Sequence, residues 1–243
     1  MLLRRGIISS GVLVSGITDP NDIAGLQLWM DGETGLTTDK SDNSYTVNNT
    51  SVTISSADLN SLDTFRYNGS AFQSIGTQLG KPANYTISAV VKWDDAAVRE
   101  CAFGSFNSGG STDESWGTCI ASQSSKPSKS IYSTLGDSTN LADSYTALDT
   151  LTNATYHIIT LRYTSGDSKV DIWVDGVSKS TTDSGTATSC SGTYYEFALG
   201  RAGAVAGAIE LTGNIAELAL YDASLSAGQI SNLEDYYTTR YAL

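Results

Sequence analysis

Asp171 and Asp175 are the closest that the sequence comes to a pair of catalytic carboxylates. They lie four residues apart on one face of a predicted strand, with Trp173 between them. Retaining glycosidases hold two carboxyl groups about 5 Å apart across a sugar bond. Asp175, however, begins an Asp-Gly pair, which is a strong signal for a hairpin turn. We therefore interpret Asp175 as a turn residue and Asp171 as an outward-facing strand residue.

The remaining reactive side chains do not form a catalytic pattern either. Glu217 lies mid-strand among apolar residues, so we interpret it as a hydrogen-bonded structural acid. The single histidine, His157, lies inside a predicted strand, and no G-x-S-x-G motif precedes a strand–helix turn. The three cysteines lack C-x-x-C spacing, which argues against zinc; buried thiols are favoured over a Cys101–Cys119 bridge. We predict no catalytic residue and no enzymatic activity.

Two sets of polar residues on predicted loops suit binding instead. Calcium prefers carboxylate, amide and carbonyl oxygens, so it is a candidate cofactor at Asp39, Asp42 and Asn43. Sugar binding needs aromatic faces beside polar groups on exposed loops. The candidate glycan-binding residues are Asn107, Asp113, Trp116, Tyr132 and Tyr145.

The elements that must position these residues are mainly strands. Alternation over 85–93 and 170–174 predicts half-buried strands. Over 215–221, strict alternation puts Ala216, Leu218 and Leu220 on one face and Ile215 with Glu217 on the other. At the end of the chain, Ser226 and Gln229 have capping-box spacing and open an amphipathic helix over 226–243. The pattern predicts an all-β fold of two packed antiparallel sheets, with one C-terminal helix.

Composition and the first residues limit the partners. A formal net charge of -12 makes nucleic acid an unsuitable partner, and no segment has the length of a membrane span. Residues 1–22 begin with two arginines and an apolar stretch, but Gly and Ser interrupt it and no cleavage site follows. We interpret residues 1–22 as an extended anchoring arm. Its contact residues are Arg4, Arg5, Ile7, Ile8, Val12 and Leu13.

Four stretches in this order resemble the concanavalin A-like lectin/glucanase superfamily, in its laminin-G-like branch. They are IAGLQLWMDG (23–32), DKSDNSY (39–45), the YHIITLRY…VDGVSKS hairpin (156–180) and GNIAELALYDASLS (213–226). The resemblance implies a jelly-roll sandwich over 23–243 whose terminal helix packs on a sheet. It also implies that some members bind sugars or calcium.

A short arm followed by such a domain is similar to phage virion proteins. We therefore expect a non-enzymatic component of the virion surface, such as a capsid decoration, spike or tail fibre. The arm would bind other virion proteins, and the domain would form a homo-oligomer, such as a trimer, that adheres to polysaccharide on the host surface. The alternative is a secreted, extracellular lectin-like module that binds carbohydrate, and a less favoured one is a glycoside hydrolase.

Overall fold

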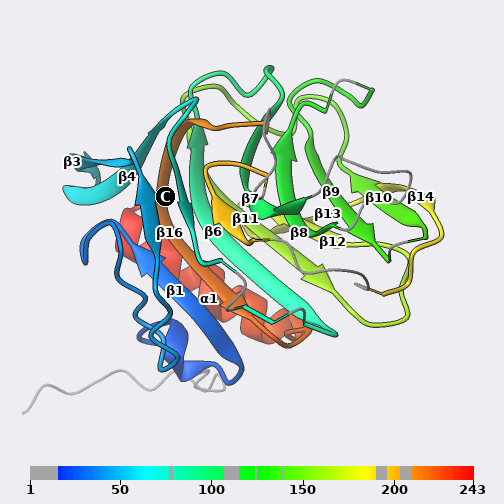
Figure 1. Cartoon of the computed structure of the whole chain (residues 1–243), viewed down its shortest axis with the longest axis horizontal. Helices are drawn as coiled ribbons and strands as arrows, with labels where there is room; N and C mark the ends of the chain where they lie inside the picture. Colours follow the sequence, from blue (N-terminus) through cyan, green and yellow to red (C-terminus); the bar gives the residue numbers. More distant parts are fainter. Residues whose placement is uncertain are drawn as a thin grey trace, which may run out of the picture.

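The computed structural model of the chain describes residues 16–76, 79–80, 82–106, 115–123, 125–137, 139–189, 196–202 and 209–243. Within these residues, two eight-stranded antiparallel sheets form a sandwich, and one α-helix lies against the outer face of one sheet (Figure 1). The predicted all-β jelly-roll sandwich with a C-terminal helix is confirmed.

The first sheet carries the helix. Its strands are β1 (Leu26–Asp31), β3 (Thr53–Leu59), β4 (Leu62–Asn68), β6 (Tyr85–Trp93), β11 (Tyr156–Tyr163), β12 (Asp171–Val174), β13 (Val177–Lys179) and β16 (Thr212–Tyr221). They follow the order β13-β12-β11-β6-β16-β4-β3, and β1 pairs with the second half of β16.

The second sheet closes the other side of the core. Its strands are β2 (Asn48–Thr50), β5 (Phe72–Ser74), β7 (Glu100–Phe106), β8 (Ser115–Ala121), β9 (Ile131–Gly136), β10 (Leu141–Tyr145), β14 (Thr182–Gly185) and β15 (Ala198–Leu199). They follow the order β14-β10-β9-β8-β7-β15-β5-β2.

Side-chain alternation along the strands builds the core between the sheets. In β6, the residues from Tyr85 to Trp93 at every second position are fully buried in this core. Their neighbours Ser88 and Val90 lie on the opposite face, under the helix. In β12, Ile172 and Val174 enter the core as predicted, while Trp173 packs on the helix side.

The strict alternation predicted for β16 is wrong, because a β-bulge interrupts this strand. The pairing of β16 with β6 shifts register between Ile215 and Glu217. Ile215 therefore shares the core face with Leu218 and Leu220, whereas Ala216 packs on the helix side. The bulge inserts one extra residue, so a strict period of two cannot hold across it. Glu217 follows the bulge and faces the helix.

The helix α1 (Ala227–Tyr241) begins as its sequence predicts. Ser226 is the N-cap and makes a reciprocal capping box with Gln229. Leu225 and Ile230, on either side of the cap, are both buried under the helix. Together with Leu233, Tyr237 and Tyr241, they form an apolar stripe. This stripe faces the first sheet, along which the helix lies in Figure 1.

The first described residues lie against the same end of the domain. A short 3-10 helix, η1 (Pro20–Asp22), buries Pro20, whose carbonyl accepts a 3.0 Å hydrogen bond from the hydroxyl of Tyr221. Ile17 packs beside the cluster under α1. Residues 1–15, with the predicted arm contacts Arg4, Arg5, Ile7, Ile8, Val12 and Leu13, lie outside the described residues. In the described part of the chain, no helix has the length and hydropathy of a membrane span.

Candidate functional site

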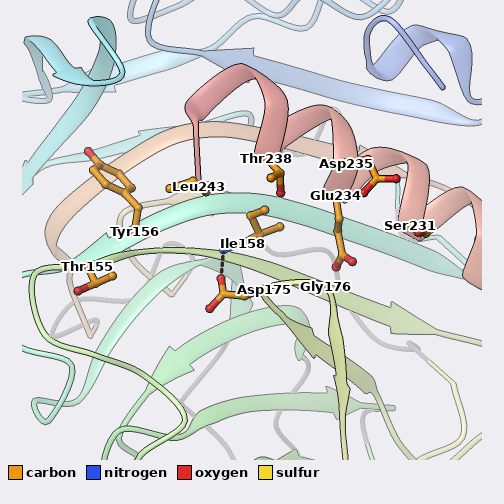
Figure 2. A pocket seen from close by; sticks show the side chains of 10 residues that line it. All are labelled: Thr155, Tyr156, Ile158, Asp175, Gly176, Ser231, Glu234, Asp235, Thr238 and Leu243. Atoms are coloured by element: carbon orange, nitrogen blue, oxygen red, sulfur yellow. Dashed lines mark hydrogen bonds between the residues drawn. The ribbon is translucent and has the colours of Figure 1, made fainter.

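A groove of about 700 Å³ runs between α1, the start of β11 and the turn that joins β12 to β13. We call it the helix groove. It is lined by Thr155, Tyr156, Ile158, Asp175, Gly176, Ser231, Glu234, Asp235, Thr238 and Leu243 (Figure 2). The buried side chain of Ile158 supplies an apolar surface, while hydroxyl and carboxylate groups come from both sides. Ligand pockets in proteins span roughly 300–1,000 Å³, so this groove has the size of one.

Glu234 is the central acid of the helix groove. Its side chain points from α1 toward the β12–β13 turn (Figure 2), and the residue is 5% exposed. Oε1 accepts a 3.0 Å hydrogen bond from Thr160, which itself contacts Ser88 at 2.8 Å. Within the described part of the chain, no hydrogen bond reaches Oε2, which lies 3.8 Å from where a Cβ on Gly176 would stand.

The surroundings of Glu234 favour its neutral form. Burial raises the pKa of Glu234 to about 7; the Thr160 hydrogen bond opposes this rise, and the charges of Asp175 and Asp235 add to it. The negative charges of these two carboxylates therefore repel a negative charge on Glu234. The three acids concentrate negative charge in the helix groove.

Asp175 is fixed by the turn that it opens. It adopts φ 51° and Gly176 φ 76°, the two positive values that a tight Asp-Gly hairpin turn requires. Its Oδ1 accepts from the backbone N–H of Ile158 at 2.9 Å, and Oδ2 lies 2.7 Å from Nδ1 of His157. The N–H of Thr152 donates to Nε2 of His157 at 3.0 Å, so the ring proton is on Nδ1. His157 is thus a partnered structural residue, as predicted.

Tyr156 closes one end of the groove. Its hydroxyl donates a short hydrogen bond to Asp58, and Nζ of Lys92 lies 4.6 Å from its ring centroid. Lys92 also pairs with Asp58 at 3.1 Å. The tyrosine is therefore held in place by the first sheet.

The predicted structural role of Glu217 is borne out by its contacts. It is fully buried beneath α1 and accepts hydrogen bonds of 2.6–3.1 Å from Trp29 Nε1, Tyr236 Oη and Tyr241 Oη. Arg240 Nε lies 3.2 Å from its Oε2. Burial raises the pKa of Glu217 to about 7, against the Tyr241 hydrogen bond and the positive charge of Arg240. The carboxylate joins β16, β1 and the helix and lies away from the groove.

The position of Trp116 in the structure contradicts its predicted place on an exposed glycan-binding loop. It lies in β8, is 5% exposed, and its ring stacks on Phe197 with centroids 5.2 Å apart. The ring of Tyr85 also contacts the Trp116 ring, with centroids 5.8 Å apart. The sequence predicts that Trp116 lies on an exposed loop, but β8 turns this indole inward, so it cannot offer a face to a ligand. Asn107 and Asp113 lie outside the described residues.

The structure brings two other predicted glycan residues together. Tyr132 and Tyr145 are direct cross-strand partners on β9 and β10. The Tyr132 hydroxyl donates to Asp143 at 2.6 Å, and Nζ of Lys126 lies 4.4 Å from the Tyr145 ring centroid. We call these four residues the tyrosine patch. Their polar groups are engaged with one another, and sugar binding there stays a prediction.

The loop predicted to bind calcium is organised by Asp39. Its two oxygens accept four hydrogen bonds of 2.8–3.0 Å, from the backbone N–H groups of Trp29, Ser41 and Tyr45 and from the hydroxyl of Ser41. Asn43 donates its amide to the carbonyl of Gln27 at 3.0 Å, and Asp42 is exposed. Calcium would have to displace these donors from Asp39, so the calcium site stays a prediction.

The other potentially reactive side chains are paired or buried. Asp171 forms an ion pair with Arg162 at 2.7 Å on the first sheet. Cys101 and Cys119 are buried free thiols, as expected, and burial raises the pKa of the Cys101 thiol to about 12. A thiol that is not ionised is a poor nucleophile. Cys190 lies outside the described residues.

The groove was not predicted from the sequence, although one signal was present. Glu234 falls within the apolar stripe of α1, next to Leu233 and one turn before Tyr237. A carboxylate at such a position must meet a buried polar partner or line an opening. Its approach to the Asp175–Gly176 turn depends on tertiary packing, which has no local signature.

Comparison with protein families places this chain in a known superfamily. The model of the concanavalin A-like lectin/glucanases superfamily matches residues 66–231, which is more than half of the chain. A search of curated proteins finds no significant match.

Several solved structures share the fold. Domain 4 of the extracellular arabinanase AbnA from Geobacillus stearothermophilus, solved with arabinotriose, is 16% identical, with a TM-score of 0.62; the match covers 86% of this chain and 98% of that one. The binding domain of botulinum neurotoxin serotype G is 13% identical, with a TM-score of 0.61 and coverage of 87% and 51%. The chain therefore spans about half of that neurotoxin domain. A Trypanosoma rangeli sialidase mutant gives 13% identity, a TM-score of 0.60 and coverage of 90% and 33%.

Proposed function

Since the chain belongs to the concanavalin A-like lectin/glucanase superfamily, we propose that it is a carbohydrate-binding module that holds a saccharide in the helix groove. The observation that carries this proposal is the buried carboxylate of Glu234, whose Oε2 faces the groove without a hydrogen bond from the described residues. Sugar hydroxyl groups are the donors that such an oxygen accepts from.

The rest of the groove suits the two surfaces of a sugar ring. Ile158 and Leu243 offer apolar contact to the C–H face of the ring. The hydroxyls of Ser231 and Thr238 lie on exposed positions of α1 and are available to the ring hydroxyls. Apolar surface combined with placed polar groups is the usual make-up of a small-molecule site.

Relatives with the same fold support a sugar ligand without defining it. The arabinanase domain was solved with arabinotriose, and cell entry of botulinum neurotoxin type C depends on two ganglioside molecules. Their identities to this chain are 16% and 11%. We propose binding without catalysis, because the helix groove acids Asp175 and Glu234 are held by structural hydrogen bonds.

The test blocks the groove and compares a matched control. Thr238 lines the helix groove, whereas Thr239 is the next residue and lines a different hollow on the other flank of α1. Both are exposed, so a tryptophan at either position leaves the core unchanged. On immobilised saccharides, Thr238→Trp should lose binding that Thr239→Trp retains. Equal binding by both variants would contradict the proposal.

A second proposed role is attachment through the N-terminal segment, as expected for a component of a virion surface. It is supported by the buried Pro20 and its hydrogen bond from Tyr221, which fix the base of that segment beside α1. Deletion of residues 1–15 should then leave the domain folded and abolish a homo-oligomer or its binding to a particle. A protein that native mass spectrometry shows to be monomeric both before and after the deletion would contradict this role.

A further inference from the structure

The charged side chains that line the helix groove are all acidic. Three of its ten lining residues are carboxylates, Asp175, Glu234 and Asp235, and none of the ten is Lys, Arg or His. The basic groups nearby are engaged elsewhere. Lys92 pairs with Asp58, and Arg240 pairs with Asp31 and Glu217 on the far side of α1. In His157, Nδ1 contacts Asp175 and Nε2 accepts from the backbone N–H of Thr152. Neither ring nitrogen is therefore available to a ligand in the groove.

Glu234 is the acid that a cation would satisfy. It is 95% buried, one oxygen accepts from Thr160, and the other is open toward the groove (Figure 2). A buried carboxylate without a countercharge is costly, which agrees with the rise of its pKa. Asp175 lies across the groove from it on the β12–β13 turn. A positive group bound at this open oxygen would relieve both the desolvation of Glu234 and its repulsion by Asp175 and Asp235.

We propose, building on the carbohydrate-binding function above, that the helix groove selects saccharides bearing a free amino group and holds the ammonium on Oε2 of Glu234, close to the negative charges of Asp175 and Asp235. An ammonium donates up to three hydrogen bonds, and those to a carboxylate are charge-assisted. A neutral hydroxyl donates one weaker bond, and an acidic sugar is repelled by the three carboxylates. Ser231 and Thr238 remain for the hydroxyls of the same ring.

The experiment compares three trisaccharides by isothermal titration near neutral pH: a glucosamine trimer, its fully N-acetylated counterpart and a uronic acid trimer. The glucosamine trimer should bind wild type about tenfold more tightly than the N-acetylated one, and the uronic acid trimer least tightly. Glu234→Gln keeps an oxygen for Thr160 and so should fold, but it removes the charge. In this variant the preference for the amine should fall to about threefold or less.

A matched variant distinguishes binding of the ammonium in the helix groove from general electrostatic attraction to an acidic protein. Asp183 is an exposed acid on β14 of the second sheet, so Asp183→Asn removes one charge far from α1. It should keep the amine preference; an equal loss in both variants would overturn the amino-sugar assignment. If the N-acetylated trimer binds as tightly as the amine, this assignment is overturned while the proposed function stands. If no saccharide binds wild type, both fail.

Discussion

The hydroxyl of Tyr241 donates a 2.7 Å hydrogen bond to Oε2 of Glu217, which joins the last turn of α1 to the middle of β16. Tyr236 and Arg240 reach the same carboxylate from the helix, and Trp29 reaches it from β1. Apolar packing buries α1, but this polar contact fixes its register on the sheet. The wall of the helix groove depends on that register, because Glu234 and Thr238 lie on the same helix.

Tyr241→Phe should destabilise the fold by about 1–2 kcal/mol. The variant keeps the buried ring but removes one donor from a fully buried carboxylate, and an unsatisfied buried group costs about that much. Urea denaturation measures the change. Tyr236→Phe is the comparison, and it should cost less because its hydroxyl is farther from Glu217, at 3.1 Å. Equal stability of wild type and Tyr241→Phe would contradict the role of this contact.

Glu234→Gln should make stability less dependent on pH. In the folded chain the pKa of Glu234 is about 7, above its ordinary value of 4.5, so between these values the folded state binds more protons than the unfolded state. Wild-type stability therefore falls as pH rises through this range. The variant lacks this loss and should gain about 1–2 kcal/mol relative to wild type between about pH 5 and pH 8.

The control for the pH measurement is Val177→Ala, which alters an exposed apolar side chain on β13 and adds no titrating group. The difference in free energy of unfolding between this variant and wild type, from urea denaturation, should be the same at about pH 5 and about pH 8. If Glu234→Gln also shows a constant difference, Glu234 does not carry the raised pKa.

Trp116→Ala should damage the fold and leave recognition intact. Deleting a buried aromatic side chain from a core typically costs about 3–5 kcal/mol, and Trp116 stacks on Phe197 within the core. Thermal denaturation should show a large loss. Saccharide affinity per folded molecule, titrated well below the melting temperature, should match wild type. A stable variant that no longer binds sugar would instead make Trp116 a ligand contact.

Gly213→Ala should be far more harmful than Gly228→Ala. A Cβ on Gly213 would lie 2.0 Å from the carbonyl oxygen of Lys92, a backbone atom of the paired strand β6. We expect a loss of about 3 kcal/mol or more. Around Gly228, in the first turn of α1, no atom beyond its chain neighbours and the helix's own backbone lies within 4 Å of an added Cβ, so alanine should stabilise by about 0.5–1 kcal/mol. Similar effects of the two substitutions on urea denaturation would refute this explanation of Gly213.

Local signals in the sequence predicted the helix and much of the sheet packing. The Ser226–Gln229 capping box fixed where α1 begins, and alternation from Tyr85 to Trp93 identified the core face of β6. Both patterns depend only on residues close in sequence. The bulge at Ala216 did not follow from them, because it reverses the faces of Ile215 and Ala216 through pairing with a strand more than a hundred residues earlier.

The site was harder to predict because its parts meet only in the folded chain. Trp116 looked like a loop residue between polar segments, but β8 pairs with β7 and turns the indole into the core. Tyr132 and Tyr145 were both named as glycan-binding candidates, and the pairing of β9 with β10 makes them direct neighbours. The helix groove combines α1 with the Asp175–Gly176 turn, and the contact between them is a tertiary one without a spacing signature.

The most direct measurement is a crystal structure of the protein with the saccharide that binds it most tightly. We expect a sugar ring in the helix groove, with a donor of the ligand at hydrogen-bond distance from Oε2 of Glu234 and the ring packed beside Ile158. A sugar bound at the tyrosine patch, with the helix groove free of ligand, would contradict saccharide binding in the helix groove.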